Sequence, residues 1–351
     1  MILAASALAA TQPFVNQFSK IKHLASAVPP SGSAKGDQNP YGVAVVPKTV
    51  GKLTRGDVLV SNFNNAQNQQ GTGSSIVKIS PSGGFSVFGV VPKPTSTPAV
   101  GLTTALVVLR SGFVVVGSLP APGGASSAAT AGALTILNSK GHVVETITGH
   151  GINGPWDMTG AQKGSTATLF VTNVLNGTVA GAGHVVKHGT VVRLTLQIHK
   201  HHAPKLISSQ VIAKGFAEHT DPNALVVGPT GVGLGPSGAL YVADSNGNRI
   251  ASIPQAMTRT SALGGGGNTV SSGGALNDPL GLAIAPNGDI VTANGADGNL
   301  VETSASGHQV ATKTLVPMGG GDLFGIAVAP HGGGLYFVND ASGVNDLELL
   351  H

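Results

Sequence analysis

Short apolar runs of small side chains recur along the chain, and each is followed by a turn and a second apolar run. The clearest copy starts at Gly231, turns at Pro236 and continues with Leu-Tyr-Val-Ala at 240–243, which ends on Asp244. Small side chains suit a crowded strand, Pro-x-Gly suits a tight turn, and a short apolar run suits a buried strand. The copy therefore predicts two antiparallel strands, with a third strand opening at Arg249.

The same unit returns along most of the chain, so the repeat predicts the fold. The aligned first positions of the six copies are Gly42, Gly101, Asp157, Gly231, Gly281 and Gly325. Four short antiparallel strands in each copy predict an all-β chain folded as a six-bladed β-propeller.

The sixth copy contains only three strands, because the chain ends at His351. The segment 14–24 precedes the first copy and alternates like a strand. We therefore predict that 14–24 pairs with the strand near 347–350 and supplies the missing fourth strand. Such pairing closes the last blade and removes the open sheet edges of the ring.

These copies resemble the NHL repeat, whose pattern here reads Gly-x-Ala-x-x-Pro-x-Gly-x-Leu-Tyr-Val-Ala-Asp-x-x-Asn-x-Arg-Ile. The resemblance is closest at 229–250, clear at 279–294 and 323–340, weaker at 40–62 and faint at 97–196. It implies the propeller fold. It implies no single activity, since such propellers serve as binding platforms, lyases and hydrolases.

Composition narrows the kinds of site that the chain can hold. Charged residues make up 10% of the 351 residues, and the neutral surface that this implies favours an extracytoplasmic protein, secreted or periplasmic. The apolar segment 1–11 is interpreted as a signal-peptide remnant, ahead of one domain at 12–351. With no cysteine, disulfides, thiolate zinc sites, iron–sulfur clusters and cysteine nucleophiles are excluded.

Charge and hydropathy exclude two classes of partner. The net charge is +4, and the excess lies in the basic stretch 187–205. A nucleic-acid site would need aromatic residues within that stretch, which contains none, so no nucleic acid is expected. The most apolar stretch, 100–119, is broken by Arg-Ser-Gly at 110–112, so no transmembrane segment is predicted.

Three insertions predict which face of the ring binds a ligand. They occupy 62–75, 119–132 and 173–190, each between the second and third strands of its blade. Such loops share a face with the loops between blades. They are either mobile decoration or a wall around the channel mouth. The residues expected to bind a ligand there are Asn39, His150, Asn153, Trp156, Asn277, Asp278 and Asp322.

Trp156 is the only tryptophan in the chain. An indole at the channel mouth offers a flat apolar surface with one N–H donor, which suits stacking on a ligand. The alternative is that it fills space between two blades.

Two further resemblances imply a divalent cation at the axis. The stretch 153–157 resembles the strand opening of gluconolactonase-like propellers, in which Glu, Asn and Asp hold the ion, and this implies calcium or magnesium. Amidating-lyase propellers use axial His ligands for zinc, and the candidates here are His150, His184, His188 and His331, of which His331 lies in a turn of the opposite face. The competing interpretation is that Asn and Asp simply cap strands and turns.

The sequence leaves two functions open. One is an exported scaffold that binds a protein or a small molecule on its loop-rich face. The other is a divalent-metal-dependent lactonase or lyase with an axial site. Because the chain has only 15 Asp and Glu residues, and few of them are placed near the axis, the sequence favours the scaffold.

Overall fold

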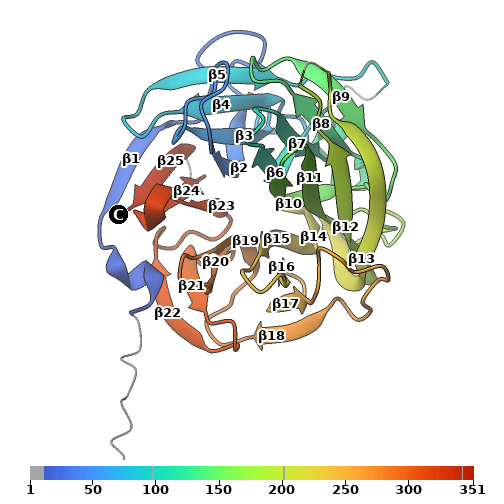
Figure 1. Cartoon of the computed structure of the whole chain (residues 1–351), viewed down its shortest axis with the longest axis vertical. Helices are drawn as coiled ribbons and strands as arrows, with labels where there is room; N and C mark the ends of the chain where they lie inside the picture. Colours follow the sequence, from blue (N-terminus) through green and yellow to red (C-terminus); the bar gives the residue numbers. More distant parts are fainter. Residues whose placement is uncertain (1–11, 97–98, 201, 342) are drawn as a thin grey trace, which may run out of the picture.

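The structure of the protein is a computed structural model that describes residues 12–96, 99–200, 202–341 and 343–351. Six antiparallel sheets stand around a common axis like the blades of a propeller (Figure 1). Five of the sheets have four strands each, and the sheet of blade three has a short fifth strand. The predicted all-β six-bladed propeller is confirmed. The segment 1–11, interpreted above as a signal-peptide remnant, lies outside the described residues.

In the first five blades, four strands run outward from the axis in chain order (Figure 1). Blade one contains β2 (Gln38–Val45), β3 (Val58–Asn64), β4 (Ser75–Ile79) and β5 (Phe85–Val90). Blade two contains β6 (Leu102–Val108), β7 (Val114–Ser118), β8 (Ala133–Leu137) and β9 (Val143–Ile147). Blade three contains β10 (Pro155–Lys163), β11 (Thr166–Asn173), β12 (Val186–Gln197), β13 (Lys205–Asp221) and β14 (Leu225–Val227).

The second half of the ring follows the same plan. Blade four contains β15 (Pro229–Leu234), β16 (Leu240–Asp244), β17 (Arg249–Ile253) and β18 (Asn268–Ser272). Blade five contains β19 (Pro279–Ile284), β20 (Ile290–Asn294), β21 (Asn299–Thr303) and β22 (Gln309–Thr314). Blade six contains β23 (Leu323–Val328), β24 (Leu335–Asn339), β25 (Asp346–Leu350) and β1 (Ile21–Ser26).

The N-terminal strand closes the ring, as predicted, because β1 pairs antiparallel with β25 and sets Ile21 opposite Leu350. The predicted extent of that strand is wrong at its start. Phe14–Gln17 forms the 3-10 helix η1 instead. The buried carboxylate of Glu302 in blade five accepts 2.8 Å hydrogen bonds from the N–H groups of Phe14 and Val15, and this fixes the helical turn.

Crowding at the axis explains the small residues of the inner strands. A Cβ atom added at Gly231, Gly281 or Gly325 would lie closer than 3.0 Å to a backbone oxygen of the next inner strand. The hydrophobic core is correspondingly divided into clusters between neighbouring blades. The glycines of the repeat therefore let adjacent blades approach one another.

The alignment of blade two needs one correction. Leu106 pairs with Val116 just as Val232 pairs with Val242 in blade four, so Ala105 holds the place of Gly231. The sequence alignment gave that place to Gly101. A register shift between Leu102 and Leu106 separates the two positions.

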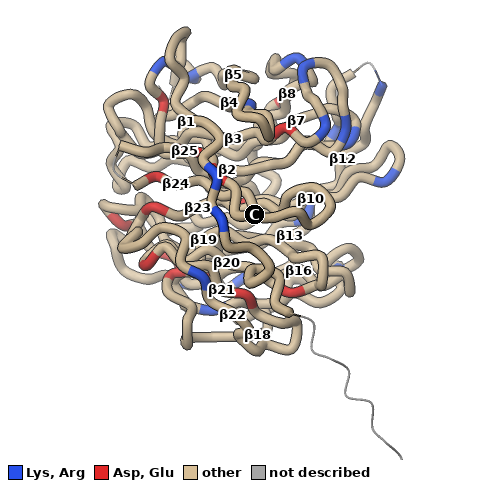
Figure 2. The backbone as a smooth tube through the Cα atoms, turned by 90° about the vertical axis from the view of Figure 1, so that its left-hand side faces the viewer, with Lys and Arg blue, Asp and Glu red and all other residues tan. Residues whose placement is uncertain are grey.

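The three insertions connect second to third strands, as predicted. They form the loops 65–74, 119–132 and 174–185, and the second contains the short 3-10 helices η2 (Pro122–Gly124) and η3 (Ser126–Ala128). Another 3-10 turn, η4 (Pro330–Gly332), joins β23 to β24. Charged positions are sparse along the chain, with a group of Lys and Arg near β8 and β12 (Figure 2). Within the described residues, no helix has the length and apolar character needed to cross a membrane.

Candidate functional site

The openings of the six inner strands surround a cavity of about 280 Å³. Each blade contributes one lining residue from the same repeat position, directly before the crowded position described above. These residues are Tyr41 on β2, Thr104 on β6, Trp156 on β10, Thr230 on β15, Leu280 on β19 and Phe324 on β23. A ring with one residue from each blade places the cavity on the propeller axis.

Loops of the insertion-bearing face complete the cavity. Asn64 at the end of β3 and Gln70 in the loop 65–74 line it from blade one. Asn223, in the hairpin between β13 and β14, lines it from the opposite half of the chain. In the described chain, the insertions 119–132 and 174–185 contribute no lining residue. Only the first insertion is therefore a wall of this cavity.

Aromatic rings form a stacked column beside the cavity. The ring of Tyr41 stacks between those of Phe63 and Phe324. Its centroid lies 4.6 Å from the Phe63 centroid and 4.2 Å from the Phe324 centroid. Trp156 meets Tyr41 and Phe63 edge-on. Trp156 is only 4% exposed and belongs to the core cluster, yet it also lines the cavity. Both interpretations of the single tryptophan are thus compatible with its position.

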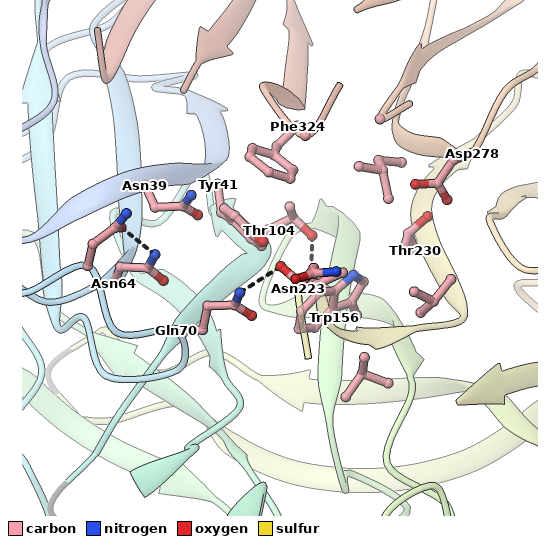
Figure 3. A pocket seen from close by; sticks show the side chains of 17 residues that line it. Asn39, Tyr41, Asn64, Gln70, Thr104, Trp156, Asn223, Thr230, Asp278 and Phe324 are labelled. Atoms are coloured by element: carbon pink, nitrogen blue, oxygen red, sulfur yellow. Dashed lines mark hydrogen bonds between the residues drawn. The ribbon is translucent and has the colours of Figure 1, made fainter. Parts of the chain in front are cut away.

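Three amides on the blade-one side form a group that we term the amide wall: Asn39, Asn64 and Gln70 (Figure 3). Their nitrogens all donate hydrogen bonds: Asn39 to the carboxylate of Asp340, Asn64 to Asn68 Oδ1 over 2.7 Å, and Gln70 to the backbone oxygen of Asn223 over 2.6 Å. Their three side-chain oxygens are buried and accept no hydrogen bond from the described residues. All three oxygens are thus enclosed by the chain and unpaired among the described residues.

Asp278 lies across the cavity from the amide wall (Figure 3). Burial raises the pKa of its carboxyl, the negative charge of Asp221 raises that pKa further, and Ser245 and His219 oppose the rise. Burial also raises the pKa of the nearby Asp340 to about 7. No Lys, Arg or His belongs to the lining of the described cavity. The site therefore disfavours negative charge.

Below the cavity, Asp157 occupies the position that glycine or alanine holds in the other blades. Its Oδ1 accepts from the N–H of Met158, and its Oδ2 accepts from the N–H of Val232 on the next inner strand, at 2.7 and 3.0 Å. Burial raises the pKa of Asp157 to about 8. The carboxyl therefore links blades three and four inside the channel.

The structure separates the residues expected at the site into two groups. Asn39, Trp156 and Asp278 line the cavity, and the remaining four lie outside its lining. The amide of Asn153 instead donates to Asn176, and that of Asn277 donates to Asp297. Asp322 is half-buried, and its backbone oxygen accepts from the N–H of Asp340.

The placement of His150 at the axis is wrong. Its backbone oxygen accepts a hydrogen bond from Ser209 on β13, an outer strand of blade three. A loop between blades runs from the rim of one blade to the axis of the next, and His150 lies at the rim end of its loop. Sharing a face of the ring is therefore not enough to bring a residue to the axis.

Sequence reasoning missed most of the lining. Tyr41 and Phe324 occupy the same repeat position as Trp156, so the repeat alignment held the signal for both. Asn64 and Gln70 lie inside the insertion 62–75, which was considered only as a whole. No sequence pattern indicated Asn223, because its place at the cavity depends on how the hairpin between β13 and β14 folds back toward the axis.

Candidate metal ligands do not gather into a cluster. Among residues 12–96, 99–200, 202–341 and 343–351, no group of three or more His, Asp or Glu is placed to hold a metal ion. His188 of the zinc hypothesis is hydrogen-bonded through Nδ1 to the backbone oxygen of Asn176. The side-chain oxygens that could ligate a metal at the cavity belong mainly to amides, and only one carboxylate is among the described lining residues.

Comparison with known proteins gives similarity at the level of structure. No protein-family model and no curated protein match the chain. A gluconolactonase from Xanthomonas campestris is 15% identical with a TM-score of 0.57, over 89% of this chain and 86% of that chain. Regucalcin from Agrobacterium tumefaciens, a calcium-binding protein, is 12% identical with a TM-score of 0.58, over 91% of each chain.

A streptogramin B lyase is 14% identical with a TM-score of 0.54, over 95% of this chain and 97% of that chain. At these identities the similarity shows the fold alone. The structural neighbours of this six-bladed propeller thus include gluconolactonase-like and lyase-like propellers.

Proposed function

We propose that the protein is a small-molecule enzyme, a lactonase-type hydrolase that acts on a hydroxyl-bearing lactone in the axial cavity. The observation that carries the proposal is Asp278, a half-buried carboxyl of raised pKa in the lining of that cavity. Similarity to gluconolactonase and lyase propellers supports an enzyme better than a scaffold for a protein partner. The repeat pattern supports assigning the blades to the NHL type.

Asp278 supplies the acid–base chemistry of the proposed reaction. Its ionised carboxylate takes a proton from a water molecule as the oxygen of that water bonds to the lactone carbonyl carbon. The ring C–O bond then breaks, and the carboxyl returns the proton to the departing ring oxygen, which gives the open hydroxy acid. Burial raises the pKa of Asp278 toward neutral pH, where a carboxyl exchanges protons most effectively.

The residues at the cavity do not fit a tightly held divalent cation. Calcium and magnesium take oxygen ligands, and calcium binds more tightly as more of those ligands are charged. Asp278 is the one carboxylate in the described lining, and it lies opposite the amide oxygens (Figure 3). The proposed reaction therefore runs through the carboxyl of Asp278.

Lactone hydrolysis by purified protein tests this function. Acid release from glucono-δ-lactone is followed with a pH indicator, in the presence of a chelator and again with added calcium, magnesium or zinc. Replacing Asp278→Asn removes the proton acceptor, so we expect the rate to fall on the order of 10²–10⁴-fold. The rate of the wild type should rise with pH through the raised pKa of Asp278, because only the ionised carboxyl acts as a base.

Glu145→Gln is the matched control, since Glu145 is an exposed acid on the outer strand β9 and should leave the rate unchanged. Full activity in Asp278→Asn would contradict the proposal. Hydrolysis that appears only with an added cation would favour the metal-dependent alternative instead.

A further inference from the structure

Blade three extends further than blade two on the face opposite the insertions. Leu106 pairs with Val116 in blade two, and Met158 pairs with Val171 at the equivalent place in blade three. Beyond these pairs, the two inner strands of blade two stay paired for two more residues and those of blade three for five. At about 3.3 Å for each residue, blade three therefore reaches roughly 10 Å further than its neighbour. A step between the two blades results.

A cavity of about 700 Å³ lies at this step, and we term it the step cavity. Its volume falls within the usual range of small-molecule sites, roughly 300–1,000 Å³. Its lining comes from the hairpin between β12 and β13, from the two turns of blade two at 111–113 and 138–140, and from Val50 of blade one. These segments join first to second strands or third to fourth strands. The step cavity therefore opens on the face opposite the insertions, and it shares no described lining residue with the axial cavity.

Part of the lining of the step cavity is apolar and open to water. Val50, Phe113, Val144 and Ile198 contribute to this part. Val144 is 36% exposed, and Phe113 is half-buried. Covering such side chains removes apolar surface from water, which stabilises a complex. A ligand with an apolar body would therefore gain affinity here.

The rest of the lining contains cations and hydrogen-bond donors. Lys140 comes from blade two and Lys200 from blade three, and neither forms an ion pair with a residue that the structure describes. His199, His202 and Ser139 also line the step cavity, and no acid belongs to its described lining. Figure 2 shows the group of Lys and Arg near β8 and β12. The step cavity therefore favours negative charge, in contrast to the axial cavity.

The sequence around the step cavity is poor in acids that could neutralise these lysines. Between positions 58 and 217 it contains ten Lys and Arg residues and only two acids, Glu145 and Asp157. Asp157 lies in the channel, and Glu145 lines a neighbouring cavity together with Lys205. Neither acid therefore offers a counter-charge inside the step cavity.

We infer that the step cavity binds an amphipathic anion, a small organic acid whose apolar body covers Phe113 and Val144. Its acidic group is attracted to Lys140 and Lys200. A purely polar anion would leave the apolar lining open to water, and an ion pair with a solvated lysine contributes little by itself. A neutral apolar molecule would leave both lysines without a counter-charge, and a cation would be repelled. The inference does not depend on Asp278 or on the proposed reaction, because the two cavities open on opposite faces.

Calorimetry on the full chain tests this inference with four probes that differ in charge and apolar body. They are octanoate, acetate, 1-octanol and octylammonium, each used at concentrations at which it is monomeric. We expect octanoate to bind at least about tenfold more tightly than each of the others, and added salt to weaken its binding. Equal affinity for acetate, 1-octanol or octylammonium, or no binding of octanoate, would overturn the inference.

Three variants locate the binding at the step cavity. Lys140→Met and Lys200→Met keep the side-chain length and remove the charge, so each should weaken octanoate binding on the order of fivefold. Val144→Thr removes one apolar methyl group at an exposed position and should weaken it about threefold. Lys214→Met is the matched control, because Lys214 is exposed on β13 and does not line the step cavity. Unchanged binding in both lysine variants, or an equal loss in the control, would overturn the inference, provided that melting temperatures show folded chains.

Further measurements separate the step cavity from the axial cavity and from the proposed function. Asp278→Asn should keep the affinity for octanoate while it loses lactone hydrolysis. The fluorescence of Trp156, the only tryptophan, should stay unchanged when octanoate binds, since Trp156 lines the axial cavity. A change in that fluorescence, or competition between octanoate and the lactone, would place octanoate at the axis and overturn the inference. Octanoate binding at the step cavity without hydrolysis of any lactone would support this inference and refute the enzyme.

Discussion

At the residue scale, one repeat position decides how closely neighbouring blades pack. Glycine holds it in four blades and Ala105 in a fifth, and an added Cβ at Gly281 would collide with the backbone of blade six. Asp157 is the exception, and its carboxyl uses the space to bind N–H groups of two inner strands. The same position therefore serves packing in most blades and a polar contact in one.

We expect Gly281→Ala to destabilise the protein by about 1–3 kcal/mol, because overpacking forces the inner strands of blades five and six apart. Gly264→Ala is the control, since an added Cβ there has no atom within 4 Å. Chemical denaturation of both variants measures the difference. Equal free energies of unfolding for Gly281→Ala and Gly264→Ala would show that the inner strands accommodate the added methyl group without loss of stability.

At the element scale, the chain ends meet in blade six. β1 pairs with β25 as the outermost strand of the last blade, and η1 is clamped by Glu302 of blade five. Phe14 and Val15 are buried in the cluster that joins blades five and six. The N-terminal segment thus fastens two blades, where the sequence predicted only a strand.

We expect deletion of residues 1–26 to lower the melting temperature sharply. The deletion opens the β25 edge, removes the buried apolar contacts of Phe14 and Val15, and takes two backbone donors from the Glu302 carboxylate. Differential scanning calorimetry measures the shift, and gel filtration detects association through the opened edge. A truncated chain that melts like the full one would refute closure as a source of stability.

At the scale of the whole molecule, buried acids make stability depend on pH. Burial raises the pKa of Asp157 and Glu218 to about 8 and that of Asp340 to about 7. The folded chain therefore holds protons that the unfolded chain has released. The stability that these groups contribute is complete below about pH 4 and is lost as pH rises to about 8.

We expect Asp157→Asn to lose less stability than the wild type between pH 5.5 and 8. Each pKa unit corresponds to about 1.4 kcal/mol, and because Asp157 is partly open to the channel we expect a difference of about 1–2 kcal/mol. Denaturant unfolding at both pH values gives the comparison, with Glu145→Gln as the exposed control. Parallel pH profiles for wild type and Asp157→Asn would contradict the assignment.

The sequence by itself determined the architecture of this protein. Strand alternation, tight turns and the repeated glycine are local signals, and six copies of one unit reinforce each other, so the blade count and the closure of the ring followed from them. The predicted face was also that of the cavity, because topology fixes which loops share a side. Asn39, Trp156 and Asp278 were named for that reason.

Only the tertiary structure decided which side chains meet at the axis. Gln70 of blade one contacts Asn223 of blade three, 153 residues further along the chain, and His150 stays at the rim although its loop lies on the predicted face. Loop paths and strand register depend on contacts between distant segments, which no local pattern encodes. For the same reason the unpartnered oxygens of the amide wall could not be read from the residues that carry them.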